Sequence, residues 1–178
     1  MTEPHDLYGL PLERFVTERE ALTKALRKAG SREQATEVAS LRKPSVAAWA
    51  VNQLVRAHGR QVAALFAAGD GLEHAQSELL TGGGDPHALR TAVERERGAV
   101  DELTELARGL LSSDGHQLTQ TTVERVSESL HAAALDPDAR AQVRGGCLAR
   151  ELRHIGLGDS GAVSWPDSSR RGPTRARA

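Results

Sequence analysis

The sequence predicts an all-α protein, an irregular bundle of about six to seven helices, and two observations support this prediction. Only 3% of the residues are aromatic, and alanine and leucine carry most of the apolar content. Sheet cores favour β-branched and aromatic residues, whereas chains rich in Ala, Leu, Glu and Arg favour helices. Apolar residues also recur at steps of three and four along most of the chain, which is the period of a helix with one buried face.

The length of 178 residues favours one domain with a tail, and Cys147 is the single cysteine, so no intramolecular disulfide is possible. We expect a flexible lead-in at 1–10, a helical domain at 11–157 and a disordered basic tail at 158–178. The first residues lack the basic start and apolar stretch of a signal peptide, and no apolar run approaches the roughly 20 residues that span a bilayer. The sequence therefore predicts a cytoplasmic protein without a membrane partner.

The N-terminal part predicts a helical hairpin. A first helix is expected from Pro11 to Ala29, because apolar side chains follow one another there at helical spacing. Gly30 ends this helix, and Ser31 with Gln34 forms a capping box for the next one. Because about two residues join the two helices, we expect them to pack antiparallel.

A third helix is expected from Pro44 to Ala57, since proline ends the second helix and suits the first turn of another. Its beginning, "VAAWAV", is apolar all round, which indicates a buried central helix. We interpret Trp49 as a core residue whose N–H finds a nearby acceptor. Asn52 is either a buried residue bonded to a neighbouring element or a surface residue at the edge of the apolar stripe.

The fourth segment, residues 61–80, is either one kinked helix or two short ones, because Gly69 and Gly71 interrupt it. Asp85 and Pro86 then start a long fifth helix. We call its apolar positions the heptad face, which consists of Leu89, Val93, Val100, Leu103, Ala107 and Leu110.

Glu96 occupies the position of the same repeat between Val93 and Val100, and it is the single charged residue of the repeat. It could fix the helix register or pair with an arginine of a facing helix, for which Arg19 is one candidate. A sixth helix is expected at 118–135, and Asp136 with Pro137 starts a short seventh that stops at Gly145. The residues after Cys147 form either a last helical turn or an extended strap.

The usual signatures of catalysis and of metal or cofactor binding are missing. No two of the seven histidines lie three or four residues apart, and none pairs with Cys147 at metal-ligand spacing. The glycine-rich stretches follow no apparent strand and lack a P-loop lysine. Most carboxylates are read as a solvated helix face. We therefore predict no catalytic residues, no metal and no cofactor, and a protein that is not an enzyme.

The charges are unevenly distributed although the net charge is only −1. Residues 1–60 carry +3, residues 61–160 carry −7 and residues 161–178 carry +3. The leading hypothesis is a non-enzymatic helical interaction or scaffold protein. A protein partner is expected, or self-association through the heptad face of the fifth helix.

A second hypothesis is a sequence-nonspecific DNA- or RNA-associated protein. The second and third helices have a helix-turn-helix rhythm, but the start of the third is too apolar to read a groove. Cations and free amides at the start of the third helix could instead hold a phosphate or carboxylate, which makes a candidate binding rim of Arg42, Lys43, Ser45 and Asn52. Further candidate phosphate contacts are Arg56, Arg60, Arg170, Arg171, Arg175 and Arg177.

Four stretches resemble a family of uncharacterised helical proteins from actinobacterial genomes. They are "LPLERFVTEREALTKALRKAG", "LRKPSVAAWAVNQLVR", "LHAAALDPDARAQVRGG" and "LARELRHIGLG". The likeness covers most of residues 10–157, and residues 41–54 are its most distinctive part. The resemblance implies a bacterial cytosolic protein, and it carries over no catalytic residue or cofactor because no activity is established for that family.

Overall fold

The computed structural model describes residues 3–113 and 119–153, and these parts of the chain contain helices and no strands. The all-α prediction is therefore confirmed. The elements in chain order are a 3-10 helix η1 (Pro4–Gly9) and the α-helices α1 (Phe15–Lys28), α2 (Arg32–Ser40), α3 (Val46–Ala57), α4 (Gly59–Leu80), α5 (Pro86–Ser113), α6 (Gln120–Leu135) and α7 (Pro137–Gly145). Residues 147–153, which we call the strap, follow α7 without helical structure.

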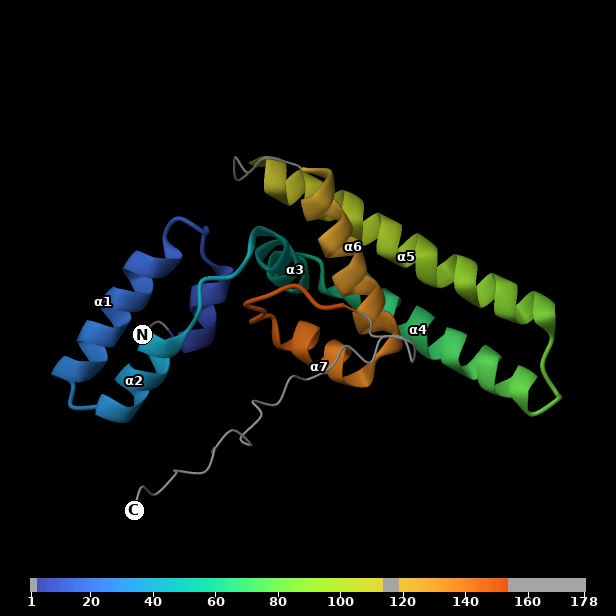
Figure 1. The fold of residues 1–178 in the computed structure, drawn as a ribbon, viewed down its shortest axis with the longest axis horizontal. Helices are drawn as coiled ribbons and strands as arrows, with labels where there is room; N and C mark the ends of the chain where they lie inside the picture. Colours follow the sequence, from blue (N-terminus) through green and yellow to red (C-terminus); the bar gives the residue numbers. More distant parts are fainter. Residues whose placement is uncertain (1–2, 114–118, 154–178) are drawn as a thin grey trace, which may run out of the picture.

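Helix α3 lies at the centre of the fold. It packs against η1, α4, α5, α6 and α7, and its residues 47–52 are all buried. Figure 1 shows α4 and α5 side by side as a long hairpin, with α6 crossing them and the α1–α2 hairpin at the opposite end of the molecule. The interpretation of α3 as the buried central helix is confirmed, because an all-apolar helix is stable only where neighbours cover every face.

The main core contains most of the heptad face of α5. Val100, Leu103 and Ala107 are at most 1% exposed and pack in one cluster with Leu54 of α3 and Leu130 of α6. Because these three side chains already fill the core of their own chain, this part of the heptad face is not free for self-association, which stays a prediction.

The residues expected as a flexible lead-in are largely structured. Residues 4–9 form η1, and Leu7 and Tyr8 are buried in a second core with Phe15 and Val38. The Tyr8 and Phe15 rings meet edge-on with their centroids 5.2 Å apart. A short 3-10 turn offers no periodicity to recognise in the sequence, yet burial of these two side chains anchors the start of the chain.

The α1–α2 hairpin is confirmed, although its capping differs from the prediction. Gly30 adopts a positive φ of 83°, the N–H of Ser31 donates to Leu26 O at 3.0 Å, and the N–H of Gly30 donates to Arg27 O at 3.1 Å. This Schellman geometry closes α1. Ser31 stands at the N-cap of α2 with ψ 66°, but its side chain makes no cap hydrogen bond, so the predicted capping box is wrong. The same residue must finish α1, which leaves its backbone outside the extended region that capping serine needs.

Helix α4 is one continuous helix, and Gly69 allows a close approach rather than a break. A Cβ atom placed on Gly69 would lie 2.0 Å from Ala134 O at the end of α6. Arg140 donates to Ala134 O at 2.7 Å and to Ala133 O at 3.2 Å, and it also pairs with Asp70 of α4. The glycine is therefore needed where α4, the end of α6 and α7 meet.

The helix starts predicted from Asp-Pro pairs are confirmed. The Asp136 carboxylate accepts hydrogen bonds from the N–H groups of Asp138 and Ala139, and Pro137 is the first residue of α7. Helix α7 ends at Gly145, as expected. No helix in the described ranges is long and apolar enough to cross a membrane. The predicted end of the domain at 157 and the tail at 158–178 lie outside the described residues.

Candidate functional site

Asn52, predicted for the binding rim, is fully buried and holds the strap. Its Nδ2 donates to Leu148 O at 2.9 Å, and its Oδ1 accepts from the Leu148 N–H at 2.8 Å. One side-chain amide thus satisfies both backbone groups of a buried residue. Asn52 is therefore not part of an exposed rim, because its donor and acceptor are both engaged inside the protein.

Ser45, also predicted for the rim, is the N-cap of α3. Its Oγ accepts from the Ala48 N–H at 3.2 Å and donates to Glu151 Oε2 at 2.6 Å, and its own N–H donates to Ala149 O at 3.1 Å. The Ser45 hydroxyl is the main reason that the pKa of Glu151 is lowered, and Arg125 at 3.2 Å acts in the same direction. The predicted anion site at the start of α3 is therefore already occupied by the chain's own Glu151 carboxylate.

Arg56, predicted as a phosphate contact, is bonded to three backbone carbonyls. Its guanidinium donates to Gly146 O at 2.5 Å, to His5 O at 2.9 Å and to Asn52 O at 3.2 Å. These bonds tie the first residues of the chain to the end of α7. Three of its hydrogen bonds thus go to the protein's own backbone although the residue is exposed, so Arg56 has a structural role, and its predicted phosphate contact stays a prediction.

Arg42, Lys43 and Arg60 are exposed, as Arg56 is. The backbone of Arg42 is held by Tyr8, whose hydroxyl donates to Arg42 O at 3.3 Å. Arg42 and Lys43 precede α3, while Arg60 follows it. A helix of 12 residues is about 18 Å long, so the fold keeps Arg60 apart from the other two. Four predicted contacts lie outside the described residues, namely Arg170, Arg171, Arg175 and Arg177.

A basic groove between α1 and α2, which the sequence reasoning missed, is the clearest cationic feature of the described chain. We call it the hairpin groove. It has a volume of about 350 Å³ and is lined by Arg19, Glu20, Thr23, Lys24, Arg27 and Ala39. The signal in the sequence was the spacing of Arg19, Thr23 and Arg27 at steps of four, which places them on one face of α1.

Two residues that line the hairpin groove donate side-chain hydrogen bonds to the backbone. Arg19 Nη1 donates to Leu41 O at 2.8 Å, and Thr23 Oγ1 donates to Arg19 O at 2.8 Å. Residues 14–43 together carry eight basic and four acidic side chains, a net charge of +4. The hairpin therefore has a local positive charge that the overall net charge of −1 conceals.

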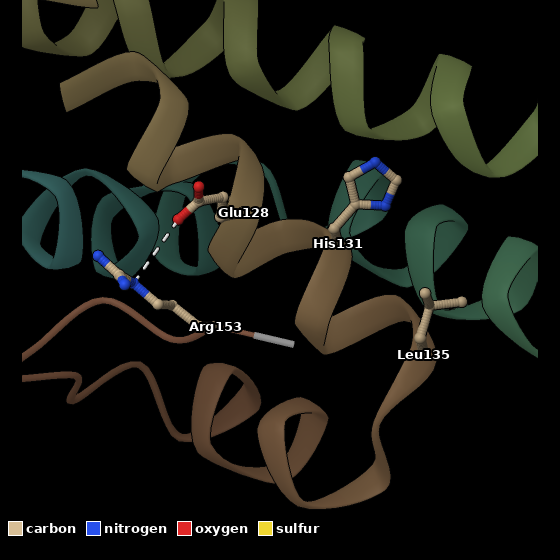
Figure 2. A pocket seen from close by; sticks show the side chains of 4 residues that line it. All are labelled: Glu128, His131, Leu135 and Arg153. Atoms are coloured by element: carbon tan, nitrogen blue, oxygen red, sulfur yellow. Dashed lines mark ion pairs between the residues drawn. The ribbon is translucent and has the colours of Figure 1, made fainter. Parts of the chain in front are cut away.

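A second pocket, the α6 pocket, lies between α6 and the strap (Figure 2). It has a volume of about 480 Å³ and is lined by Glu128, His131, Leu135 and Arg153. Glu128 and Arg153 form an ion pair at 4.0 Å, drawn as a dashed line in Figure 2, and Leu135 is 40% exposed. The pocket thus combines a charged rim with an exposed apolar side chain.

Glu96 is a buried carboxylate next to the α6 pocket, 2% exposed. Its Oε1 lies 2.7 Å from His131 Nδ1, an ion-pair distance, but makes no hydrogen bond of good geometry in the described part of the chain. Burial raises the pKa of Glu96, and His131 opposes this shift. Arg19 is not its partner, because Arg19 bonds to Leu41 in the hairpin.

Trp49, the candidate core residue of α3, is 5% exposed, and its Nε1 donates to Leu10 O at 2.9 Å. Its predicted core role is confirmed.

Among the described residues, no group of three or more His, Cys, Asp or Glu side chains could hold a metal ion. The resemblance to an actinobacterial family stays a prediction. Comparison with protein-family models, with curated proteins and with solved structures finds no match.

Proposed function

We propose that this protein is a non-enzymatic helical interaction protein whose α1–α2 hairpin binds an acidic segment of a partner protein. The observation that carries the proposal is the hairpin groove, where Arg19, Lys24 and Arg27 line one hollow on the surface. Carboxylates are the natural partners of such a cluster, since a guanidinium can donate two parallel hydrogen bonds to one carboxylate.

The position of the hairpin leaves this groove accessible. Helix α1 packs on α2 and η1, and Figure 1 shows the hairpin away from α4, α5 and α6. The apolar side chains of the hairpin are turned toward the second core around Phe15 and Val38. The hairpin is thus anchored by its apolar face, while its basic face remains for a partner.

The chemistry of the groove favours a protein segment over nucleic acid. Glu20 lies among the cations of the groove, and a volume of about 350 Å³ accommodates a few side chains rather than the backbone of a duplex. Each exposed ion pair contributes only about 0.2–1 kcal/mol. Binding therefore needs several pairs together and is expected to weaken as salt is added.

A fluorescently labelled peptide of eight glutamates tests the proposal by anisotropy. Reversing two charges in Lys24→Glu/Arg27→Glu is expected to weaken binding about tenfold at low salt, because two attractive pairs become repulsive, a change of about 1.4 kcal/mol. Arg90→Glu/Arg95→Glu is the matched control, since both side chains are exposed on α5 and the charge change is the same. Equal losses in the two variants, or no binding by the wild type, would reject the proposal.

The alternative function is sequence-nonspecific DNA or RNA association. It is favoured by the exposure of Arg42 and Lys43 directly after α2, on the same basic hairpin. A labelled 20-nucleotide single strand in the same assay separates the two. Tighter binding of the strand than of the peptide, with a steep salt dependence and a loss in Arg42→Ala/Lys43→Ala, would replace the acidic-segment proposal by this alternative.

A further inference from the structure

The acidic side chains of α4 and α5 lie at the end of the molecule opposite the basic hairpin. Residues 59–113, which we call the α4–α5 arm, carry nine acidic and five basic side chains, a net charge of −4. The α1–α2 hairpin carries +4 and lies at the other end of the fold (Figure 1). The two ends thus have equal and opposite charges, and charge complementarity of this kind steers two molecules toward each other.

Three exposed carboxylates form one line along α5. We call them the acidic stripe, which consists of Glu94, Asp101 and Glu105. Steps of seven and four residues place them on one face of the helix, over a length of about 16–17 Å. Val100 and Leu103 occupy the opposite face and are buried. The acidic stripe therefore points away from the core of its own chain.

The carboxylates of the acidic stripe remain available to a partner. Within residues 3–113 and 119–153, Glu94 and Asp101 enter no ion pair, and Glu105 pairs with Arg108 of the same helix at 3.0 Å. An exposed pair of this kind contributes little and is readily exchanged. The hairpin groove of the same chain is out of reach, because the hairpin lies away from α4 and α5 (Figure 1).

We propose that the acidic segment bound by the hairpin groove is the acidic stripe of a second copy of this chain. The inference rests on the proposed function, since it names the partner of the same groove. The cations of the groove extend from Arg19 to Arg27, about 12 Å along α1, so α1 of one copy and α5 of the next present charged lines of similar length. The contact is heterologous, because it joins two different surfaces, and it leaves the heptad face in the core.

Sedimentation equilibrium of the full-length protein tests the association. The mass is expected to rise above the 19.1 kDa of one chain at low salt, at protein concentrations up to about 1 mM, and to return to that value at high salt. Asp101→Asn/Glu105→Gln is expected to weaken the association about fivefold, because two exposed ion pairs are lost. Glu73→Gln/Glu78→Gln is the matched control with the same charge change, since both side chains are exposed on α4, and it should associate like the wild type.

Charge exchange between two variants tests the pairing of the two surfaces. Lys24→Glu/Arg27→Glu and Asp101→Lys/Glu105→Lys should each be monomeric alone, because groove and stripe then carry the same sign. Their equimolar mixture should associate, since the reversed groove of one variant meets the reversed stripe of the other. A mixture that stays monomeric overturns the proposal.

Cross-linking identifies the copy to which each side chain belongs. A carbodiimide joins a lysine amine to a carboxylate with loss of water, and the chain has three lysines, Lys24, Lys28 and Lys43, all in residues 14–43. In a mixture of unlabelled and 15N-labelled wild type, we expect links from Lys24 to Asp101 or Glu105 that contain one chain of each isotope. Links to the acidic stripe that never combine the two isotopes overturn the proposal.

Binding of the octaglutamate peptide separates this inference from the proposed function. Asp101→Asn/Glu105→Gln leaves the hairpin groove unchanged, so it should bind the peptide as the wild type does while its self-association is weakened. A wild type that binds the peptide but stays at 19.1 kDa at low salt overturns the second copy as partner and leaves the proposed function standing. A wild type that neither binds the peptide nor associates rejects both.

Discussion

Replacing Asn52 with alanine is expected to release the strap from α3. The Asn52 amide is the partner of both the N–H and the C=O of Leu148, at 2.8 and 2.9 Å, and the site is buried. Alanine removes both partners and supplies none. The backbone of Leu148 must then stay unsatisfied in the core or move into water together with the strap.

The expected loss of stability follows from the unpaired N–H and C=O groups of Leu148. A buried backbone group left without a partner costs about 1–3 kcal/mol, so two of them amount to about 2–6 kcal/mol. Release of the strap limits this penalty, and we expect the free energy of unfolding to fall by about 3 kcal/mol. Domains of this size are stable by about 5–15 kcal/mol, so the variant folds but is clearly weakened.

Urea denaturation and amide hydrogen exchange measure the two consequences separately. Asn52→Ala is expected to lower the urea midpoint and to speed exchange at Leu148. Gln53→Ala is the control on the same helix, because Gln53 makes one partly buried bond to Tyr8 O at 3.2 Å, and its loss should stay below about 1 kcal/mol. A loss of less than about 0.5 kcal/mol in Asn52→Ala, with unchanged exchange at Leu148, would refute this account of the strap.

Two other predictions concern helix packing and pH. Gly69→Ala is expected to lower the free energy of unfolding by at least about 2 kcal/mol, because its Cβ would overlap Ala134 O. Gly71→Ala, which meets nothing within 4 Å, should instead stabilise the protein by about 0.5–1 kcal/mol in the same denaturant series. Since the pKa of Glu96 is raised in the folded state, its contribution to stability is present below the ordinary glutamate pKa and is lost as pH rises through the raised value. Glu96→Gln should therefore gain thermal stability over the wild type as pH increases, and parallel melting temperatures from pH 4 to 9 would contradict this.

The features that sequence could predict are local ones. Asp136 and Pro137 start a helix through contacts within four residues, and the spacing of Val100 and Leu103 is enough to identify a buried face. Trp49 lies in an apolar run without a polar face, so its burial could be predicted from the sequence. In each case the determining interaction lies within a helical turn or is set by hydrophobic periodicity.

Two members of the candidate rim, Ser45 and Asn52, are structural because they have distant partners. Asn52 binds Leu148, 96 residues later, and Ser45 binds Glu151, 106 residues later. A polar residue at a helix start is equally suited to an outside ligand and to the chain's own backbone, and only the fold decides between them. The hairpin groove was missed because its cations are spread over α1 and line a groove only where α2 packs beside them.

The distance along the chain between α3 and the strap also bears on how the protein folds during synthesis. Leu148 leaves the ribosome 96 residues after Asn52, roughly 5–20 s later at ordinary rates of translation. Throughout that interval Asn52 lacks its final polar partner, and α6 and α7, which also cover α3, are synthesised only in its last part. A nascent chain stalled in this window exposes α3, so chaperone binding and aggregation during synthesis should both concentrate on residues 46–57.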